Sequence, residues 1–239
     1  MTIDEICRKY NITNYTINDD GSVDVDNNVS FYGLSFNKLP LRFGKVSGYF
    51  ECSANELTTL EGAPHTVGYG FFCDQNKLTN LEGGPKSIGE SYNCSHNKLT
   101  SLEGAPVEIP SDFMCRGNQL TSLEGSPEIV GGRFRCLSNN LTDLKNGPKS
   151  VGGDFDCAGN VIEHIYGFDT QYMGSFLCED NPIASIFSGV EQEFTDAFRI
   201  YKVVKDREVN LKRLKYVFEI FNKWVPMKSI EKHYNIKWV

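Results

Sequence analysis

Seven of the eight cysteines recur at a constant interval of 21 residues, and thiols at a fixed spacing can bind a metal, form disulfides or act as nucleophiles. Zinc sites gather four ligands around one point, commonly from paired cysteines, whereas this series places one thiol in each repeat. Thiols on adjacent strands would come within bridging range, but side chains in the same register point in parallel into the interior. We therefore interpret the series as small buried hydrophobic residues, with no metal and no cofactor. The series is Cys52, Cys73, Cys94, Cys115, Cys136, Cys157 and Cys178.

The remaining titratable residues give no pattern typical of an active site. A column of glutamates follows the same interval, and we interpret it as a solvated face. None of the four histidines stands in a metal-binding or zinc-hydrolase motif, and no phosphate-binding loop or nucleophile elbow is present. We expect no catalytic residue and no enzymatic activity. The glutamate column is Glu61, Glu82, Glu103 and Glu124.

The elements that position these columns come from one repeated unit, F-x-C-x-x-N-x-L-T-x-L-E-G-x-P-x-x-V-G-G. An aromatic residue and a cysteine alternate on a short strand, an asparagine turns the chain, and two aliphatic residues fill the interior. One coil cannot bury its own apolar face, so stacked coils must supply the core. The asparagine column, whose amides we expect to bond backbone groups, is Asn55, Asn76, Asn97, Asn118, Asn139, Asn160 and Asn181.

The unit resembles the leucine-rich repeat, L-x-L-x-x-N/C-x-L, with Phe and Cys in the first two leucine positions. The resemblance is closest to the short units of bacterial and bacteriophage proteins, and the lead-in segments 15–26 and 38–46 look like the entry of phage-encoded members. It implies a solenoid with a curved parallel β-sheet on the concave side. A unit of 21 residues is too short for a strand and a full helix, so we expect an extended or 3₁₀ convex side.

We divide the chain into three parts. Residues 1–28 form an N-terminal cap of a short helix and a hairpin, residues 29–188 form about seven coils, and residues 189–239 form an α-helical C-terminal cap. The acidic turn at Asp19 and Asp20 does not fit a calcium loop, since Thr16 and Asn27 stand where acids are needed. The segment 186–239 carries a net charge of +4 against −11 for residues 1–185. Its basic helices are either a cap alone or a second binding module, and Lys212, Arg213 and Lys215 could hold phosphate.

The positions that the repeat leaves free face outward on the sheet. In the middle coils they combine aromatic, Met and Arg side chains, the types enriched at interface centres, with acidic residues at the rim. Isolated apolar residues are common on any surface, but this grouping favours a partner-binding site on the concave face. The candidate residues are Phe72, Asn93, Met114, Arg116, Arg133, Arg135 and Leu137.

The charge of −7 argues against nucleic-acid binding, and no apolar run reaches the ~18 residues that span a bilayer. Without a secretory leader at Met1 we expect a cytoplasmic protein, in the host cytoplasm if phage-encoded. We expect a non-enzymatic scaffold that binds a host protein and blocks a host defence or process. The alternatives are a phage structural component that self-associates through its ends or C-terminal helices, and an enzyme or nucleotide binder. Neither the oligomeric state nor the partner follows from the sequence.

Overall fold

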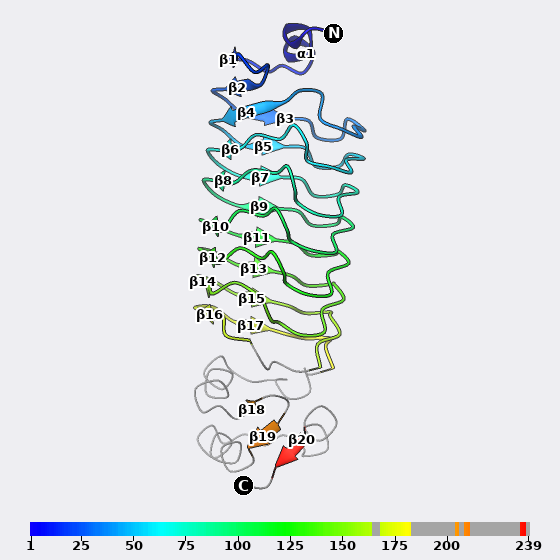
Figure 1. Cartoon of the computed structure of the whole chain (residues 1–239), viewed down its shortest axis with the longest axis vertical. Coiled ribbons are helices and arrows are strands. Elements are labelled where there is room, and N and C mark those ends of the chain that lie inside the picture. The colour runs from blue at the N-terminus through cyan, green and yellow to red at the C-terminus, as the bar shows by residue number, and fades with distance from the viewer. Residues whose placement is uncertain (164–167, 183–203, 206–207, 211–234, 238–239) are drawn as a thin grey trace.

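The computed structural model describes residues 1–163, 168–182, 204–205, 208–210 and 235–237. Over the first two ranges the chain winds into an elongated parallel β-solenoid (Figure 1). One coil equals the 21-residue period, because paired strands join a residue to its repeat counterpart, as Phe71 pairs with Tyr92. The predicted repeat solenoid of parallel strands with little helix is thereby confirmed.

One strand from each coil enters an eight-stranded parallel sheet, which we call the long sheet. From β5 to β15, the first residue of each strand is buried and the second is half-buried, as expected when successive side chains point to opposite faces. The strands are β3 (Val29–Ser30), β5 (Phe50–Glu51), β7 (Phe71–Phe72), β9 (Tyr92–Asn93), β11 (Phe113–Met114), β13 (Phe134–Arg135), β15 (Phe155–Asp156) and β17 (Phe176–Leu177).

A second column of short strands lies just before the first in each coil. It forms two sheets, one of five strands headed by the hairpin β1 (Tyr15–Ile17) and β2 (Val23–Val25), and one of four. The return path is thus extended here, as predicted, and the finding that the sequence did not indicate is that its extended residues pair between coils as regular strands. The strands are β4 (Phe43–Val46), β6 (Thr66–Val67), β8 (Ser87–Ile88), β10 (Glu108–Ile109), β12 (Ile129–Val130), β14 (Ser150–Val151) and β16 (Gln171–Tyr172).

Pro110 explains why this second column divides between β8 and β10. The equivalent Gly131 donates its backbone N–H to the carbonyl of Ile109 in the preceding coil, at 2.8 Å. Proline has no N–H, so the matching bond from Pro110 to the previous coil cannot form. The long sheet on the other side of the corner continues without interruption.

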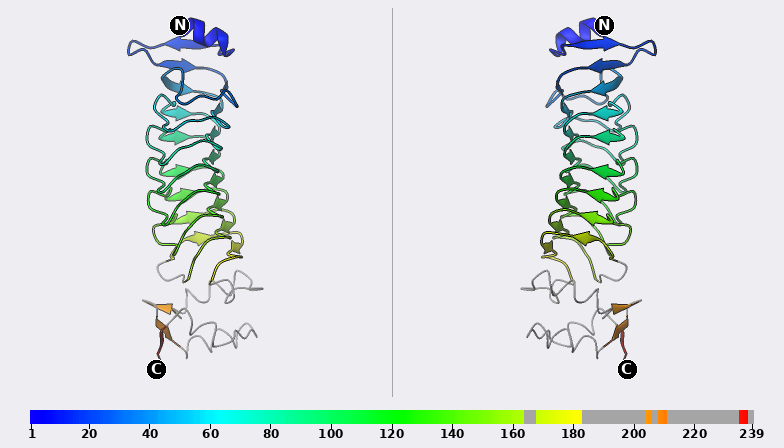
Figure 2. Two further views of the ribbon diagram at one scale, coloured as in Figure 1. Left: turned by 90° about the vertical axis from the view of Figure 1, so that its right-hand side faces the viewer. Right: turned by 90° about the vertical axis from the view of Figure 1, so that its left-hand side faces the viewer.

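The coils stack along a nearly straight axis in Figures 1 and 2, so these views show little of the sheet curvature that the resemblance implies. A repeat solenoid bends when its two sides have different widths, as when helices oppose strands. Here both columns consist of strands, which share one spacing of about 4.8 Å. We therefore refer below to the outer face of the long sheet rather than to a concave face.

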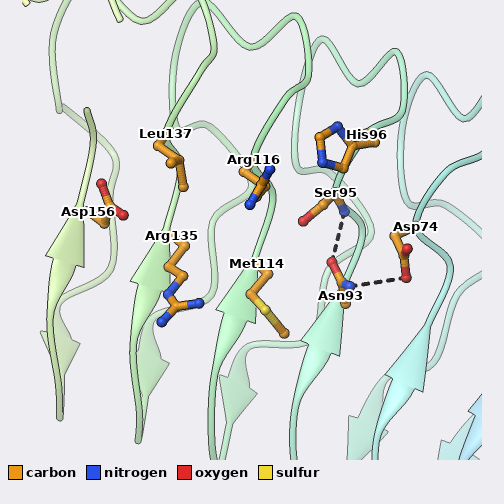
Figure 3. Close-up of a pocket in the computed structure, with 9 residues that line it drawn as sticks. All are labelled: Asp74, Asn93, Ser95, His96, Met114, Arg116, Arg135, Leu137 and Asp156. Atoms are coloured by element: carbon orange, nitrogen blue, oxygen red, sulfur yellow. Dashed lines mark hydrogen bonds between the residues drawn. The ribbon is translucent and has the colours of Figure 1, made fainter. Parts of the chain in front are cut away.

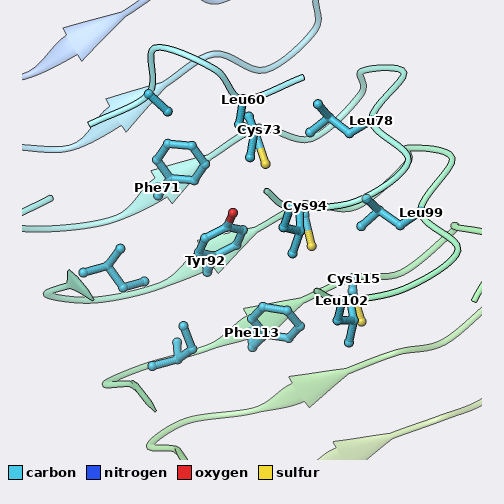
Figure 4. Close-up of a cluster of buried hydrophobic side chains, with 14 of the residues drawn as sticks. Leu60, Phe71, Cys73, Leu78, Tyr92, Cys94, Leu99, Leu102, Phe113 and Cys115 are labelled. Atoms are coloured by element: carbon cyan, nitrogen blue, oxygen red, sulfur yellow. The ribbon is translucent and has the colours of Figure 1, made fainter. Parts of the chain in front are cut away.

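The interior is built from columns of equivalent side chains, one from each coil (Figure 4). The ring centroids of successive coils lie 5.1 to 5.7 Å apart from Phe50 to Phe155, and the leucines after each asparagine lie beside the rings. The cysteines are all buried and none forms a disulfide. Burial raises the pKa of the Cys94 thiol well above its usual value and that of Cys178 to about 12, so these thiols stay protonated and unreactive.

The buried asparagines form a ladder of hydrogen bonds between coils. Asn118 is typical: its Nδ2 donates to the carbonyls of Cys94 and Cys115 at 3.1 and 3.0 Å, and its Oδ1 accepts the backbone N–H of Leu99 at 3.0 Å. Each amide thus satisfies polar groups of two coils that would otherwise be buried without partners. The side-chain bonding expected of this column is present from Asn55 to Asn181.

At the N-terminus, helix α1 (Ile3–Lys9) begins with a capping box. The Thr2 hydroxyl accepts from the N–H of Glu5, whose carboxylate accepts from the N–H of Thr2 at 2.9 Å. Cys7 is fully buried against the first coil. In the hairpin turn, the carboxylate of Asp20 is occupied by Ser22 and by Arg42 at 2.6 Å.

The described residues beyond Pro182 are three short strands. They are β18 (Val204–Lys205), β19 (Glu208–Asn210) and β20 (Asn235–Lys237), with β19 antiparallel to β18 and parallel to β20. Val204, which lies in the segment predicted to be an α-helical cap, is in a strand. The rest of the predicted helical segment, including Lys212, Arg213 and Lys215, lies outside the described residues.

The aromatic column contains one buried hydroxyl group, that of Tyr92. This Oη is fully buried and has no oxygen or nitrogen partner in the part of the chain described; its polar neighbour is the weakly bonding Cys73 thiol, and Gly84 leaves room for it. We expect Tyr92→Phe to raise the free energy of unfolding by about 1 kcal/mol in urea titrations, because an unpaired buried hydroxyl is removed. Phe113→Tyr, the matched reverse change one coil away, should lower it, and a destabilised Tyr92→Phe would contradict this account.

Candidate functional site

Five outward-facing side chains form a continuous row across the middle of the long sheet. Parallel register places Phe72 beside Asn93, Asn93 beside Met114, Met114 beside Arg135, and Arg135 beside Asp156. Neighbours in such a row are about 4.8 Å apart at the backbone. The repeat thus brings together residues that lie far apart in the sequence and differ from coil to coil.

A hollow of about 330 Å³ lies over these strands (Figure 3). It contains five of the seven candidate residues. Phe72 and Arg133, the other two, do not line it. The lining residues are Asp74, Asn93, Ser95, His96, Met114, Arg116, Arg135, Leu137 and Asp156.

One side of the hollow is held by a hydrogen-bond network centred on Asp74. Its carboxylate accepts from the hydroxyl of Ser53 at 2.7 Å, from Nδ2 of Asn93 at 3.0 Å and from Gln75 at 3.1 Å. The Asn93 Oδ1 in turn accepts the backbone N–H of Ser95 at 3.1 Å (Figure 3). These bonds fix the amide and the carboxylate in place, so this wall is preformed.

The other side carries positive charge. Arg116 is exposed, and Arg135 is half-buried next to Asp156. Burial is the main cause that raises the pKa of the Asp156 carboxyl, and the backbone N–H of Ala158 and the guanidinium of Arg135 oppose it. Burial, followed by the charge of Asp74, also raises the pKa of Glu51 at the edge of the face.

The two candidates outside the hollow are held by local contacts. Arg133 Nε lies 3.3 Å from the carboxylate of Asp154, and both side chains are partly exposed. Phe72 is half-buried over Gly70, where a Cβ would lie 2.6 Å from the ring. Both residues therefore belong to the outer face but border the hollow rather than line it.

We compared the chain with protein-family models, with curated proteins and with solved structures, and no match was found. The candidate site is therefore defined by the geometry of this structure alone.

Sequence reasoning did not select His96, which lies at the rim against Gly117. His96 directly precedes the repeat asparagine and adopts a left-handed φ of 53° in the turn, so its side chain reaches the edge of the face. The available signal was a histidine at a turn position that is Ala, Gln, Gly, Ser or Asp in the other coils.

We also searched the described residues for metal ligands, membrane-spanning helices and clefts around the glutamate column. Among the described residues, no three His, Cys, Asp or Glu side chains are grouped as metal ligands, and no helix is long and apolar enough to cross a bilayer. The glutamates of the 61–124 column are exposed, and Glu61 lines a second hollow, of about 560 Å³, near the N-terminus. The hollow combines polar, charged and apolar side chains, and one of its walls is held by hydrogen bonds.

Proposed function

We propose that this protein is a non-enzymatic recognition scaffold that binds another protein through the outer face of its long sheet. The observation that carries the proposal is the hollow, in which Arg116 and Arg135 lie beside Met114 and Leu137, opposite the hydrogen-bonded wall of Asp74 and Asn93. Arginine and methionine are enriched at interface centres, and a preformed surface loses little entropy on binding.

The proposal includes a relation to the leucine-rich repeat proteins of bacteria and bacteriophages. It is supported by the match of the repeat unit and by the asparagine ladder. On this basis the protein is phage-encoded, its partner is a host protein in the host cytoplasm, and its effect is to block a host defence or process by occlusion. A scaffold that acts by occlusion needs no catalytic group.

The experiment is affinity purification from bacterial lysate with the full chain as bait, analysed by mass spectrometry. A triple variant, Phe72→Ala with Arg133→Ala and Arg135→Ala, should lose the captured partner while its melting temperature stays close to that of the wild type, since surface changes rarely exceed about 0.5 kcal/mol each. The matched control replaces Glu82, Glu103 and Glu124 with Ala, because these side chains are exposed away from the face. Equal capture by both variants would exclude the face as the binding site.

A further inference from the structure

The outer face carries its charges in a fixed order from coil to coil. Across the hollow, Asp74 lies on the first coil, Arg116 and Arg135 lie on two adjacent middle coils, and Asp156 lies on the last. Neighbouring coils are about 4.8 Å apart, so both positive charges fall within reach of one small anionic group. The acids enclose this positive centre on both sides along the stack.

These charged side chains differ in the hydrogen bonds and charged neighbours that they have within the protein. Asp74 already accepts three hydrogen bonds from Ser53, Asn93 and Gln75. Arg135 has Asp156 beside it, and Asp156 Oδ1 accepts the N–H of Ala158 at 3.2 Å. The backbone carbonyl of Arg116 accepts from the His96 N–H, but the Arg116 side chain makes no hydrogen bond or ion pair with any described residue. Its guanidinium lines the hollow with its N–H donors free to bind a ligand.

The surroundings of Arg116 specify the shape of its ligand. A guanidinium binds a carboxylate through two parallel hydrogen bonds. Apolar contact is offered by Leu137, at the equivalent position of the next coil, and by Met114, two residues before Arg116. A polyanion such as RNA is disfavoured, since its further phosphates would meet Asp74 and Asp156. A single carboxylate with apolar or basic neighbours is complementary to a positive centre that has an acid on each side.

We propose, on the basis of the function proposed above, that the hollow binds one Asp or Glu side chain of a partner protein, presented on a short segment with an adjacent apolar residue. Arg116 makes the bidentate contact, Arg135 adds the second positive charge, and Met114 and Leu137 hold the apolar neighbour. Basic residues that flank the acid in the partner face Asp74 and Asp156.

The test selects ligands from a random dodecapeptide library on the immobilised full chain, followed by fluorescence anisotropy with the enriched peptides. We expect enriched peptides to contain one Asp or Glu next to an apolar residue. Arg116→Ala should weaken their binding by at least about tenfold, the scale of a charge-assisted bidentate contact. Replacing the peptide acid with its amide should do the same, and the two losses should not add, because each removes the same contact. The control is Lys98→Ala, which removes an exposed positive charge in the turn of the β9 coil and should leave binding unchanged.

The outcomes separate this inference from the broader proposal. Peptides that are lost with Met114→Ala but are insensitive to loss of their acid would overturn the carboxylate assignment and leave a binding face in place. Absence of enrichment, or tighter Arg116-dependent binding of a single-stranded RNA probe, would overturn the inference. The capture of a partner from lysate tests the broader proposal independently of peptide affinity.

Discussion

Asn139→Ala will lower the free energy of unfolding by at least about 3 kcal/mol, whereas Asn140→Ala, one residue later, will leave it within about 0.5 kcal/mol of the wild type. The two asparagines are identical in type and adjacent in the chain. They differ in that Asn139 is buried and Asn140 is exposed. The pair therefore isolates the contribution of the ladder from any general effect of removing an amide.

The expected size follows from the groups that lose their partner. Asn139 Nδ2 donates to the carbonyls of Cys115 and Cys136 at 3.1 and 3.0 Å, and its Oδ1 accepts the N–H of Leu120 at 3.1 Å. Truncation leaves these backbone groups buried and unpaired in two coils, at about 1 to 3 kcal/mol for each group that water cannot reach. A solenoid is not bound to unfold in one step, so a local measurement is also needed.

Urea titration gives the global effect, and amide hydrogen exchange gives the local one. The amide of Leu120 should lose protection in Asn139→Ala and keep it in Asn140→Ala. If Asn139→Ala unfolds at the same urea concentration as the wild type, the ladder does not hold the coils together. Asn139→Asp should be no better than Ala, because a carboxylate cannot donate to the two carbonyls.

The sequence determines the columns because a strict period leaves one way to stack the coils. The positions of the aromatic rings, the thiols and the asparagines all follow from it, and their burial shows that neighbouring coils share one register. The second column of strands was not predicted. From β6 onward its strands are only two residues long, and they pair only between coils, so no pattern within one coil predicts them.

The near-straight axis and the divided second column are likewise properties of stacking. They depend on equal strand spacing on both sides and on the break in pairing between coils next to Pro110, which has no N–H. For the candidate site, counting positions back from each asparagine indicated which side chains face outward, because alternation on a strand is a local property. Which of them enclose a hollow depends on side-chain packing, and for this reason Arg133, with Asp154 beside it, and Phe72, over Gly70, fall outside it.

The second large effect on stability is expected at a glycine where two coils approach each other closely, and a second glycine with the same backbone conformation provides a control. Gly21, in the hairpin turn, and Gly125, at the end of the Glu124 turn, have the same φ of +78°. A Cβ at position 21 would meet nothing within 4 Å. A Cβ at position 125 would meet the backbone of the preceding coil, at Glu103 N and at the carbonyl carbon of Leu102, 2.6 Å away.

Gly125→Ala should therefore cost more than about 3 kcal/mol of unfolding free energy, while Gly21→Ala should cost about 1 kcal/mol. Both variants place an alanine in the strained left-handed region, but only Gly125→Ala must also push two coils apart. Because the coils share one axis, that displacement should also reduce amide protection at Leu102, whose N–H donates to the Glu124 carbonyl at 3.0 Å. Equal losses of stability in urea for the two variants would show that backbone conformation alone requires glycine at position 125, and that close stacking of the coils does not.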